Sequence, residues 1–162
     1  MQKEASKKSS ALLSDTLLRS RTLWAFLIPF FIYFFTAPHS VTFEDSGLFI
    51  LASYYWGIPH PPGYPLYTML SHFFTWLPFG EVAFRVSLFS VVCGALGSVF
   101  CYLIYKRLSE RPILALLAAL VVAFSATMWS QMIVAEVYPL NYFLCLMFLY
   151  GCLYIADHPS EK

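Results

Sequence analysis

Apolar runs that approach a bilayer-spanning length recur along the chain, separated by short polar links. A transmembrane helix needs about 20 mostly apolar residues. Four segments come near that length: about 23–38, 82–105, 113–129 and 139–155. The pattern predicts an all-α, polytopic membrane protein with about four transmembrane helices in a membrane domain over residues 23–155.

The 39–81 loop between the first two predicted spans is nearly as apolar as the spans themselves. Apolar residues recur at close to helical spacing over 43–56, and Gly57 is a suitable helix stop. Pro65 suits the first position of a second helix, which ends at 78–80. Both pieces are too short to cross a bilayer comfortably, so we predict two helices lying in the outer membrane interface.

The positions of the basic residues predict the orientation of the chain. They form three clusters: the tail 1–22, the link 106–111 and Lys162. Short loops enriched in Lys and Arg face the cytoplasm. Both termini, including the 156–162 tail, are therefore predicted to be cytoplasmic. The 39–81 loop and the 130–138 turn then face the periplasm, or the lumen in a eukaryote.

The composition agrees with a membrane protein. Hydrophobic residues make up 59% of the chain and charged residues 12%, compared with about 25% charged residues in soluble domains. A formal net charge of +1 argues against a nucleic-acid partner. The four cysteines lie within apolar runs, where they act as small hydrophobic residues. A cleaved signal peptide is an alternative for the first span, but the long basic region before it favours an uncleaved helix.

An acidic pair, Glu44 and Asp45, opens the outer loop. One interpretation is a capping box, with Thr42 as the N-cap and Asp45 reaching back from the third helical position. The other is a carboxylate that acts as general base on an acceptor hydroxyl. The two are compatible, because the cap needs only one carboxylate. The pair alone is a weak signal for a divalent metal, and the sequence has no HExxH motif, Cys/His cluster or Gly-rich phosphate loop that identifies a cofactor.

The segment His60-Pro-Pro-Gly-Tyr64-Pro65 predicts a stiff turn, because three prolines and one glycine leave it few conformations. It could serve as a rigid connector between the two interfacial helices. In the functional interpretation, the turn holds His60, with Tyr64 beside it, against a phosphate or a carboxylate. An imidazole suits a lipid-linked phosphate because it can donate a hydrogen bond and gain charge.

Two further groups of polar residues lie on the predicted outer side. Glu136, Tyr138 and Asn141 flank the start of the last span. They are either ordinary first-turn residues or face the same cavity as Asp45. Arg85 follows Glu81 by four residues, which favours a local ion pair. As the one basic residue outside the cytoplasmic clusters, Arg85 is also a candidate for a phosphate.

The combination of EDSG, HPPGYP and AEVYPLN, in that order after a basic N-terminus and a first membrane helix, resembles the GT-C membrane glycosyltransferases. More closely, the sequence resembles a bacterial family of uncharacterised domains related to a eukaryotic transmembrane O-mannosyltransferase that acts on receptor ectodomains. The resemblance covers about residues 23–155. It implies a partial GT-C fold, in which this chain corresponds to the amino-terminal part of the enzyme.

The resemblance also implies a reaction and roles for residues. A sugar would pass from a polyprenyl-phosphate donor to an acceptor hydroxyl on a protein or glycan at the outer or luminal face, with inversion at the sugar carbon. Asp45, or Glu44, would deprotonate the acceptor. His60 would line the donor-phosphate region, and Glu136 would be a second acid at the same cavity. The bacterial inner membrane is the expected location, with the endoplasmic reticulum as the alternative.

The chain has fewer predicted helices than these enzymes usually have. It is therefore expected to be a fragment or a short gene product, or to work with a second chain that supplies the remaining helices. A non-catalytic membrane subunit, or a truncated relic that scaffolds a partner, is the alternative function. A small transporter fits less well, because the predicted spans carry few polar residues at their centres.

Overall fold

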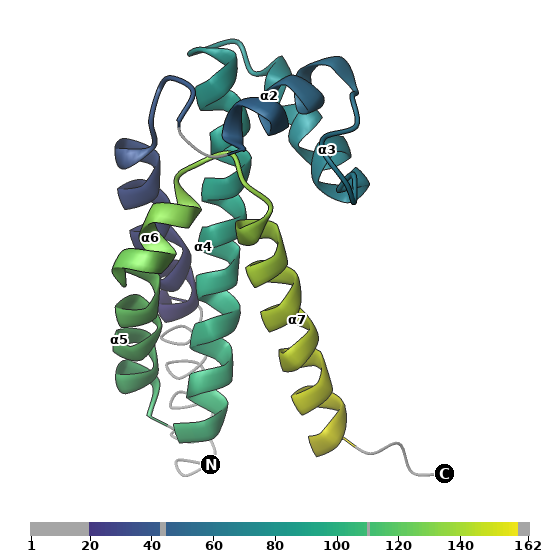
Figure 1. Ribbon diagram of the computed structural model, residues 1–162. Coiled ribbons are helices and arrows are strands. Elements are labelled where there is room, and N and C mark those ends of the chain that lie inside the picture. The colour runs from purple at the N-terminus through teal and green to yellow at the C-terminus, as the bar shows by residue number, and fades with distance from the viewer. Residues whose placement is uncertain (1–19, 43–44, 110, 159–162) are drawn as a thin grey trace, which may run out of the picture.

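The computed structural model describes residues 20–42, 45–109 and 111–158, and these contain helices and no strand (Figure 1). The predicted all-α class is confirmed. The first helix, Ser20–Thr36, is called the N-terminal helix here. The others are α2 (Ser46–Tyr55), α3 (Pro65–His72), the 3-10 helix η1 (Phe73–Trp76), α4 (Val82–Ser109), α5 (Pro112–Ala123), α6 (Ala126–Met132) and α7 (Tyr138–Asp157).

Helix α4 is the central element of the structure. It stands between α5 and α7 in Figure 1, and it contacts every helix from α2 to α7. Side chains of α4 belong to each of the four buried apolar clusters of the described residues. The largest of these joins Phe84, Leu88 and Val91 of α4 to Tyr33 of the N-terminal helix. The other helices are therefore positioned by their packing against α4.

Two glycines of α4 allow α6 and α7 to come close to it. A Cβ atom added to Gly94 would lie 2.7 Å from the sulfur of Met132 on α6. A Cβ atom added to Gly97 would overlap the ring of Tyr142 on α7. Both contacts are closer than real Cβ atoms allow, so a side chain at Gly94 would displace Met132 and one at Gly97 would displace Tyr142.

The helices give fewer candidate membrane spans than the four predicted. By length and composition, α4 and α7 could each cross a membrane, and α5 with α6 makes a third if that bent pair counts as one span. The N-terminal helix is apolar but only 17 residues long. The described part of the chain therefore contains two or three candidate spans.

The expected single helix over 113–129 is wrong, because α5 and α6 meet at a bend of 70°. Ser125 has an extended backbone at the break, and its hydroxyl donates to the carbonyl of Val122 (2.8 Å). The Tyr33 hydroxyl donates to the carbonyl of Ala123 (2.7 Å). This carbonyl lies at the end of α5, where the break removes the helix amide that it would otherwise accept from. A side chain 90 positions away therefore stabilises the bend.

The predicted capping box at Thr42 is also wrong. Helix α2 begins at Ser46, its N-cap is Asp45, and no side chain caps it. The Thr42 hydroxyl instead donates to the hydroxyl of Ser46 (2.8 Å). At the other end the helix stops at Trp56, one residue before the expected Gly57, because Trp56 takes the left-handed conformation and its ring packs on His72 (ring centroids 4.1 Å apart). Helix α3 begins at Pro65, as expected.

The two ends of the bundle differ in character. At one end lie the link from α4 to α5 and the end of α7 (Figure 1). Arg107 connects two of these elements, since it donates to the carbonyl of Leu153 (2.8 Å) and forms an ion pair with Asp157. At the other end lie α2, α3 and the link from α6 to α7.

Gly97→Ala is expected to lower the stability of the protein by about 1–3 kcal/mol, the usual cost of overpacking a core. Gly151→Ala is the matched control, because nothing lies within 4 Å of a Cβ atom at Gly151 and alanine is the better helix former. Thermal unfolding in nanodiscs, followed by circular dichroism, measures both. Equal losses in the two variants would contradict the close contact between α4 and α7.

Candidate functional site

A cavity of about 720 Å³ lies between the start of α2 and the α6–α7 region. Its lining combines one acid from the outer loop with acidic, amide and aromatic residues from α6, α7 and their link. The lining residues are Asp45, Thr127, Met128, Gln131, Met132, Glu136, Tyr138, Asn141 and Tyr142. Four residues predicted from separate parts of the sequence, Asp45, Glu136, Tyr138 and Asn141, therefore share one cavity.

Asp45 reaches this cavity from the N-cap position of α2. Its carboxylate makes no capping hydrogen bond and is paired with His60, whose Nε2 lies 3.1 Å from Oδ2. The Asp45 side chain is 60% exposed and the His60 side chain 37%. Since only one carboxylate oxygen contacts the histidine, the other can meet a substrate in the cavity.

The turn that follows His60 directs its ring toward Asp45. His60 Nδ1 lies 2.9 Å from the carbonyl of Pro61, and the amide of Gly63 donates to the carbonyl of His60 (2.9 Å). Gly63 has a φ of +93°, a conformation that favours glycine. Both nitrogens of the His60 ring are thus engaged by acceptors close to it.

Aromatic packing fixes the same ring from two sides. Phe49, which is 1% exposed, lies one helical turn after Asp45 on α2 and packs edge-on against His60 (centroids 5.8 Å apart). Tyr64 packs against both rings, at 5.6 Å from His60 and 5.5 Å from Phe49. The position of Asp45 relative to His60 therefore depends on a rigid apolar support rather than on the ion pair alone.

Glu136 provides the second carboxylate of the cavity and is buried, with 4% exposure. The backbone amide and carbonyl of Glu136 each lie 3.5 Å from the hydroxyl of Ser90 on α4. Burial raises the pKa of the neighbouring Tyr67, Ser90 opposes the rise, and the charge of Glu136 adds to it. The Tyr67 hydroxyl therefore stays protonated.

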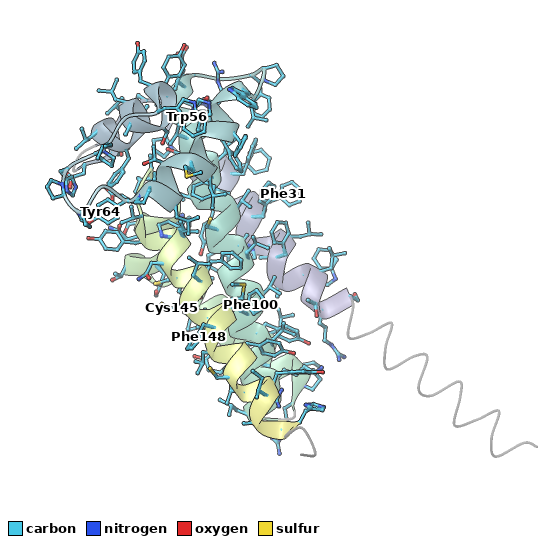
Figure 2. All side chains as sticks on the ribbon, turned by 90° about the vertical axis from the view of Figure 1, so that its right-hand side faces the viewer. Phe31, Trp56, Tyr64, Phe100, Cys145 and Phe148 are labelled. Carbon is cyan, nitrogen blue, oxygen red and sulfur yellow. The ribbon has the colours of Figure 1, made fainter. Side chains whose placement is uncertain are left out.

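A second cavity, of about 430 Å³, adjoins the first between α3 and α7. Most of its lining is apolar or aromatic: Tyr64, Pro65, Leu66, Tyr67, Val137, Leu140 and Leu144, together with Tyr138 and Asn141. Tyr138 and Asn141 line both cavities and so mark their boundary. Figure 2 shows Tyr64 beside the start of α7, with Cys145 and Phe148 further along the same helix.

Arg85 does not join this site. Its Nη1 donates to the carbonyl of Thr75 (2.8 Å) and its Nε to the carbonyl of Gly80 (3.1 Å), so it holds the turn between η1 and α4. The favoured ion pair with Glu81 is not formed, and Arg85 lines neither cavity. The geometry gives its predicted donor-phosphate role no support.

The other predictions divide as follows. His60 contacts Asp45, and Tyr64 lies in the second cavity, whereas Glu44 falls outside the described residues. The sequence pattern did not assign Tyr142 or Gln131 to the site. Tyr142 lies within an apolar run, so nothing in the sequence marks it as a site residue. Gln131 is a polar residue next to a predicted span, and that position could have marked it. The described residues contain no group of three or more His, Cys, Asp or Glu side chains that could hold a metal ion.

Comparison with known proteins assigns the chain to a family. Residues 45–162 match the protein O-mannosyl-transferase TMEM260 N-terminal domain. The chain is 42% identical over 114 residues to the protein O-mannosyl-transferase TMEM260 of Mus musculus, covering 68% of this chain and 16% of that protein. It is 35% identical over 123 residues to the protein of the same name from Dictyostelium discoideum, covering 73% of this chain and 15% of that protein.

The matched region spans about one sixth of the length of these two relatives. No solved structure gives a significant match. The relation to a eukaryotic O-mannosyltransferase, predicted from the sequence motifs, is confirmed. Together with its candidate spans, this relation indicates that the chain is an integral membrane protein.

Arg85→Gln is expected to lower stability by about 1–2 kcal/mol, because two carbonyls lose a charged donor, and to leave ligand binding at the cavity unchanged. Arg111→Gln is the control, since Arg111 is an exposed cation at the other end of α4. Thermal unfolding measures the first effect, and a ligand-binding titration measures the second. Weaker donor binding by a stably folded Arg85→Gln variant would restore the phosphate role.

Proposed function

The chain belongs to the protein O-mannosyl-transferase TMEM260 N-terminal domain family, and from this premise we propose that it forms the acceptor-activating part of a membrane glycosyltransferase. The donor is mannose linked to a polyprenyl phosphate, and the acceptor is a hydroxyl group on a protein or glycan. The name of the relatives supports the sugar and the type of reaction. The two cavities support the type of donor.

The observation that carries the proposal is the junction of a carboxylate-lined cavity with an apolar one. A lipid-linked sugar has a polar head and a hydrocarbon tail, and it needs contiguous sites for both. Asp45 and Glu136 line the larger cavity, Leu140 and Leu144 line the smaller, and Tyr138 lies at the boundary. The sugar would occupy the first cavity, the first isoprene units the second, and the phosphate the boundary.

The reaction follows from the position of Asp45. Its free carboxylate oxygen removes the proton from the acceptor hydroxyl as the oxygen attacks the anomeric carbon of the sugar. The new carbon–oxygen bond forms while the bond from the anomeric carbon to the phosphate oxygen breaks. The electron pair leaves with the polyprenyl phosphate. Direct attack of this kind inverts the configuration at the anomeric carbon.

The proposed orientation places this site on the outer or luminal side. Lys106 and Arg107 are in the last turn of α4 and Arg111 is in the link to α5. That end of α4 lies opposite to α2 and α3 (Figure 1). Cytoplasmic loops are enriched in such cations. An acceptor on the outer side then reaches Asp45 from water, whereas the donor reaches the cavity between α3 and α7 from the membrane.

Binding tests the proposal first. The protein in nanodiscs, titrated with polyprenyl-phosphate-linked mannose, is expected to bind it saturably and not to bind a water-soluble nucleotide-linked mannose. The difference arises because only the lipid-linked donor fills the apolar cavity. Equal binding of the two donors, or of neither by a well-folded sample, would refute the proposed donor and favour a non-catalytic scaffold.

Asp45→Asn is expected to retain donor binding and to reduce mannose transfer about 10²–10⁴-fold, because an amide cannot accept the proton. Asp157→Asn is the matched control: it makes the same chemical change in an exposed acid at the opposite end of α7. Transfer is measured with radiolabelled donor and membranes that contain each variant. Full transfer by Asp45→Asn would exclude Asp45 as the base.

A further inference from the structure

We infer that Gln131 is a specificity-determining residue of the larger cavity, where its side-chain amide hydrogen-bonds one hydroxyl of the donor sugar. This inference rests on the proposed function and deepens it, because it assigns sugar recognition to a residue that takes no part in the proton transfer at Asp45. Three observations carry it: a buried amide oxygen to which the described residues offer no hydrogen bond, the face of α6 on which it lies, and the chemistry of a group that would satisfy it.

Buried side-chain oxygens without a hydrogen-bond partner gather at the two cavities. Among the described residues there are four, on Tyr67, Tyr102, Gln131 and Tyr142. Gln131 and Tyr142 line the larger cavity, and Tyr67 lines the smaller one. Most buried polar groups in proteins are hydrogen-bonded, and each exception calls for a physical explanation. Three of the four exceptions here belong to residues of the candidate site.

Within this group, the described residues offer least to Gln131. The hydroxyl of Tyr67 has Ser90 beside it, and that of Tyr142 has the thiol of Cys101. A hydroxyl can also rotate its hydrogen to suit a neighbour, whereas an amide oxygen can only accept. A buried acceptor that stays unpaired destabilises the folded protein. A ligand group that donates to this oxygen therefore gains binding free energy there.

The bend between α5 and α6 brings Gln131 to the cavity. Thr127, Met128, Gln131 and Met132 line it, and residues four apart lie on one face of a helix. Met132 is 2% exposed and lies against Gly94 of α4, which fixes this face of α6 on the bundle. The last bond of a glutamine side chain rotates over a broad range. The amide can therefore turn its covered oxygen toward a ligand without movement of α6.

The group that suits this amide is a sugar hydroxyl rather than a phosphate. A phosphate presents acceptor oxygens, whereas a hydroxyl can donate to the amide oxygen and accept from the amide nitrogen. The Asp45 side chain is 60% exposed, but the Gln131 oxygen is buried. An acceptor substrate that arrives from water therefore meets Asp45 first, and the sugar of the donor is the group that reaches Gln131.

A contact of this kind discriminates between sugars. A site built to hydrogen-bond a hydroxyl rejects an analogue that lacks it, because the buried polar group is then left unpaired. Gln131 thus selects a donor by the position of one hydroxyl on the sugar ring. Its contribution is to donor binding, and the removal of the proton from the acceptor stays with Asp45.

Gln131→Met tests the unpaired oxygen in the protein without ligand. Methionine resembles glutamine in shape and has no amide, so the variant is expected to unfold about 2–4 °C above the wild type. Ser130→Ala is the control, since Ser130 is an exposed residue of α6 that lines neither cavity. Thermal unfolding in nanodiscs measures both. An unchanged or lower unfolding temperature for Gln131→Met, or its failure to fold, overturns the inference, because the amide is then satisfied within the protein.

Donor analogues test the recognition itself. The wild type and Gln131→Met in nanodiscs are titrated with polyprenyl-phosphate-linked mannose and with analogues that each lack one free hydroxyl of the sugar. We expect the wild type to bind one analogue about tenfold more weakly than the full donor, and Gln131→Met to lose that difference. Ser130→Ala should keep it. The same preferences in the wild type and Gln131→Met overturn the inference.

The inference and the proposed function fail in different ways. If the wild type binds the full donor and its preferences survive in Gln131→Met, only the role of Gln131 fails. If the wild type binds no lipid-linked mannose, the proposed function fails and the role of Gln131 fails with it.

Discussion

Gly94 and Gly97 lie about one turn apart on α4, and the two side chains that pack against them, Met132 and Tyr142, also line the cavity that contains Asp45. The cavity therefore depends on how closely α6 and α7 approach α4. Glycine is the residue that permits such approach between helices in a membrane, where packing rather than hydrophobic burial drives association. A larger residue at either position would displace a side chain that lines the cavity.

The Asp45–His60 pair contributes little to this stability. Exposed ion pairs are typically worth about 0–1 kcal/mol, and both side chains are more than a third exposed. The support comes instead from Phe49, which is almost fully buried beneath the pair. The chain thus separates two tasks: apolar packing sets the geometry, and the polar groups remain available for chemistry.

Part of this arrangement could be predicted from the sequence. The helical class follows from long apolar runs, and the choice of Asp45 as a candidate site residue follows from the cost of a charge near hydrocarbon. Other features depend on residues distant in sequence. The sequence before α6 contains no proline or glycine that would predict the bend. The carbonyl left free at the bend accepts a hydrogen bond from Tyr33 of the N-terminal helix, which is distant in sequence. The capping box failed because α2 begins only at Ser46.

The candidate site also combines features that the sequence predicts with features that depend on packing. Its acids and amides could be selected by their unusual location, but their partners could not. His60 is 15 positions from Asp45, and the turn between α2 and α3 must fold back before the two can meet. Arg85 was a candidate because of its charge, yet two backbone carbonyls occupy its guanidinium. Local patterns identify which residues are polar at a membrane face, and only packing decides what each one contacts.

Among the described residues, one face of α7 packs on α4 and the rest of the helix is open, with Phe148 73% exposed. The smaller cavity lies at the start of this open helix. An amphiphile can therefore approach it by lateral diffusion within one leaflet, without passing through water. Its effective concentration is then its mole fraction in the bilayer rather than its amount per volume. Saturation of such a site is set by membrane composition, and diluting the sample at constant lipid ratio leaves it unchanged.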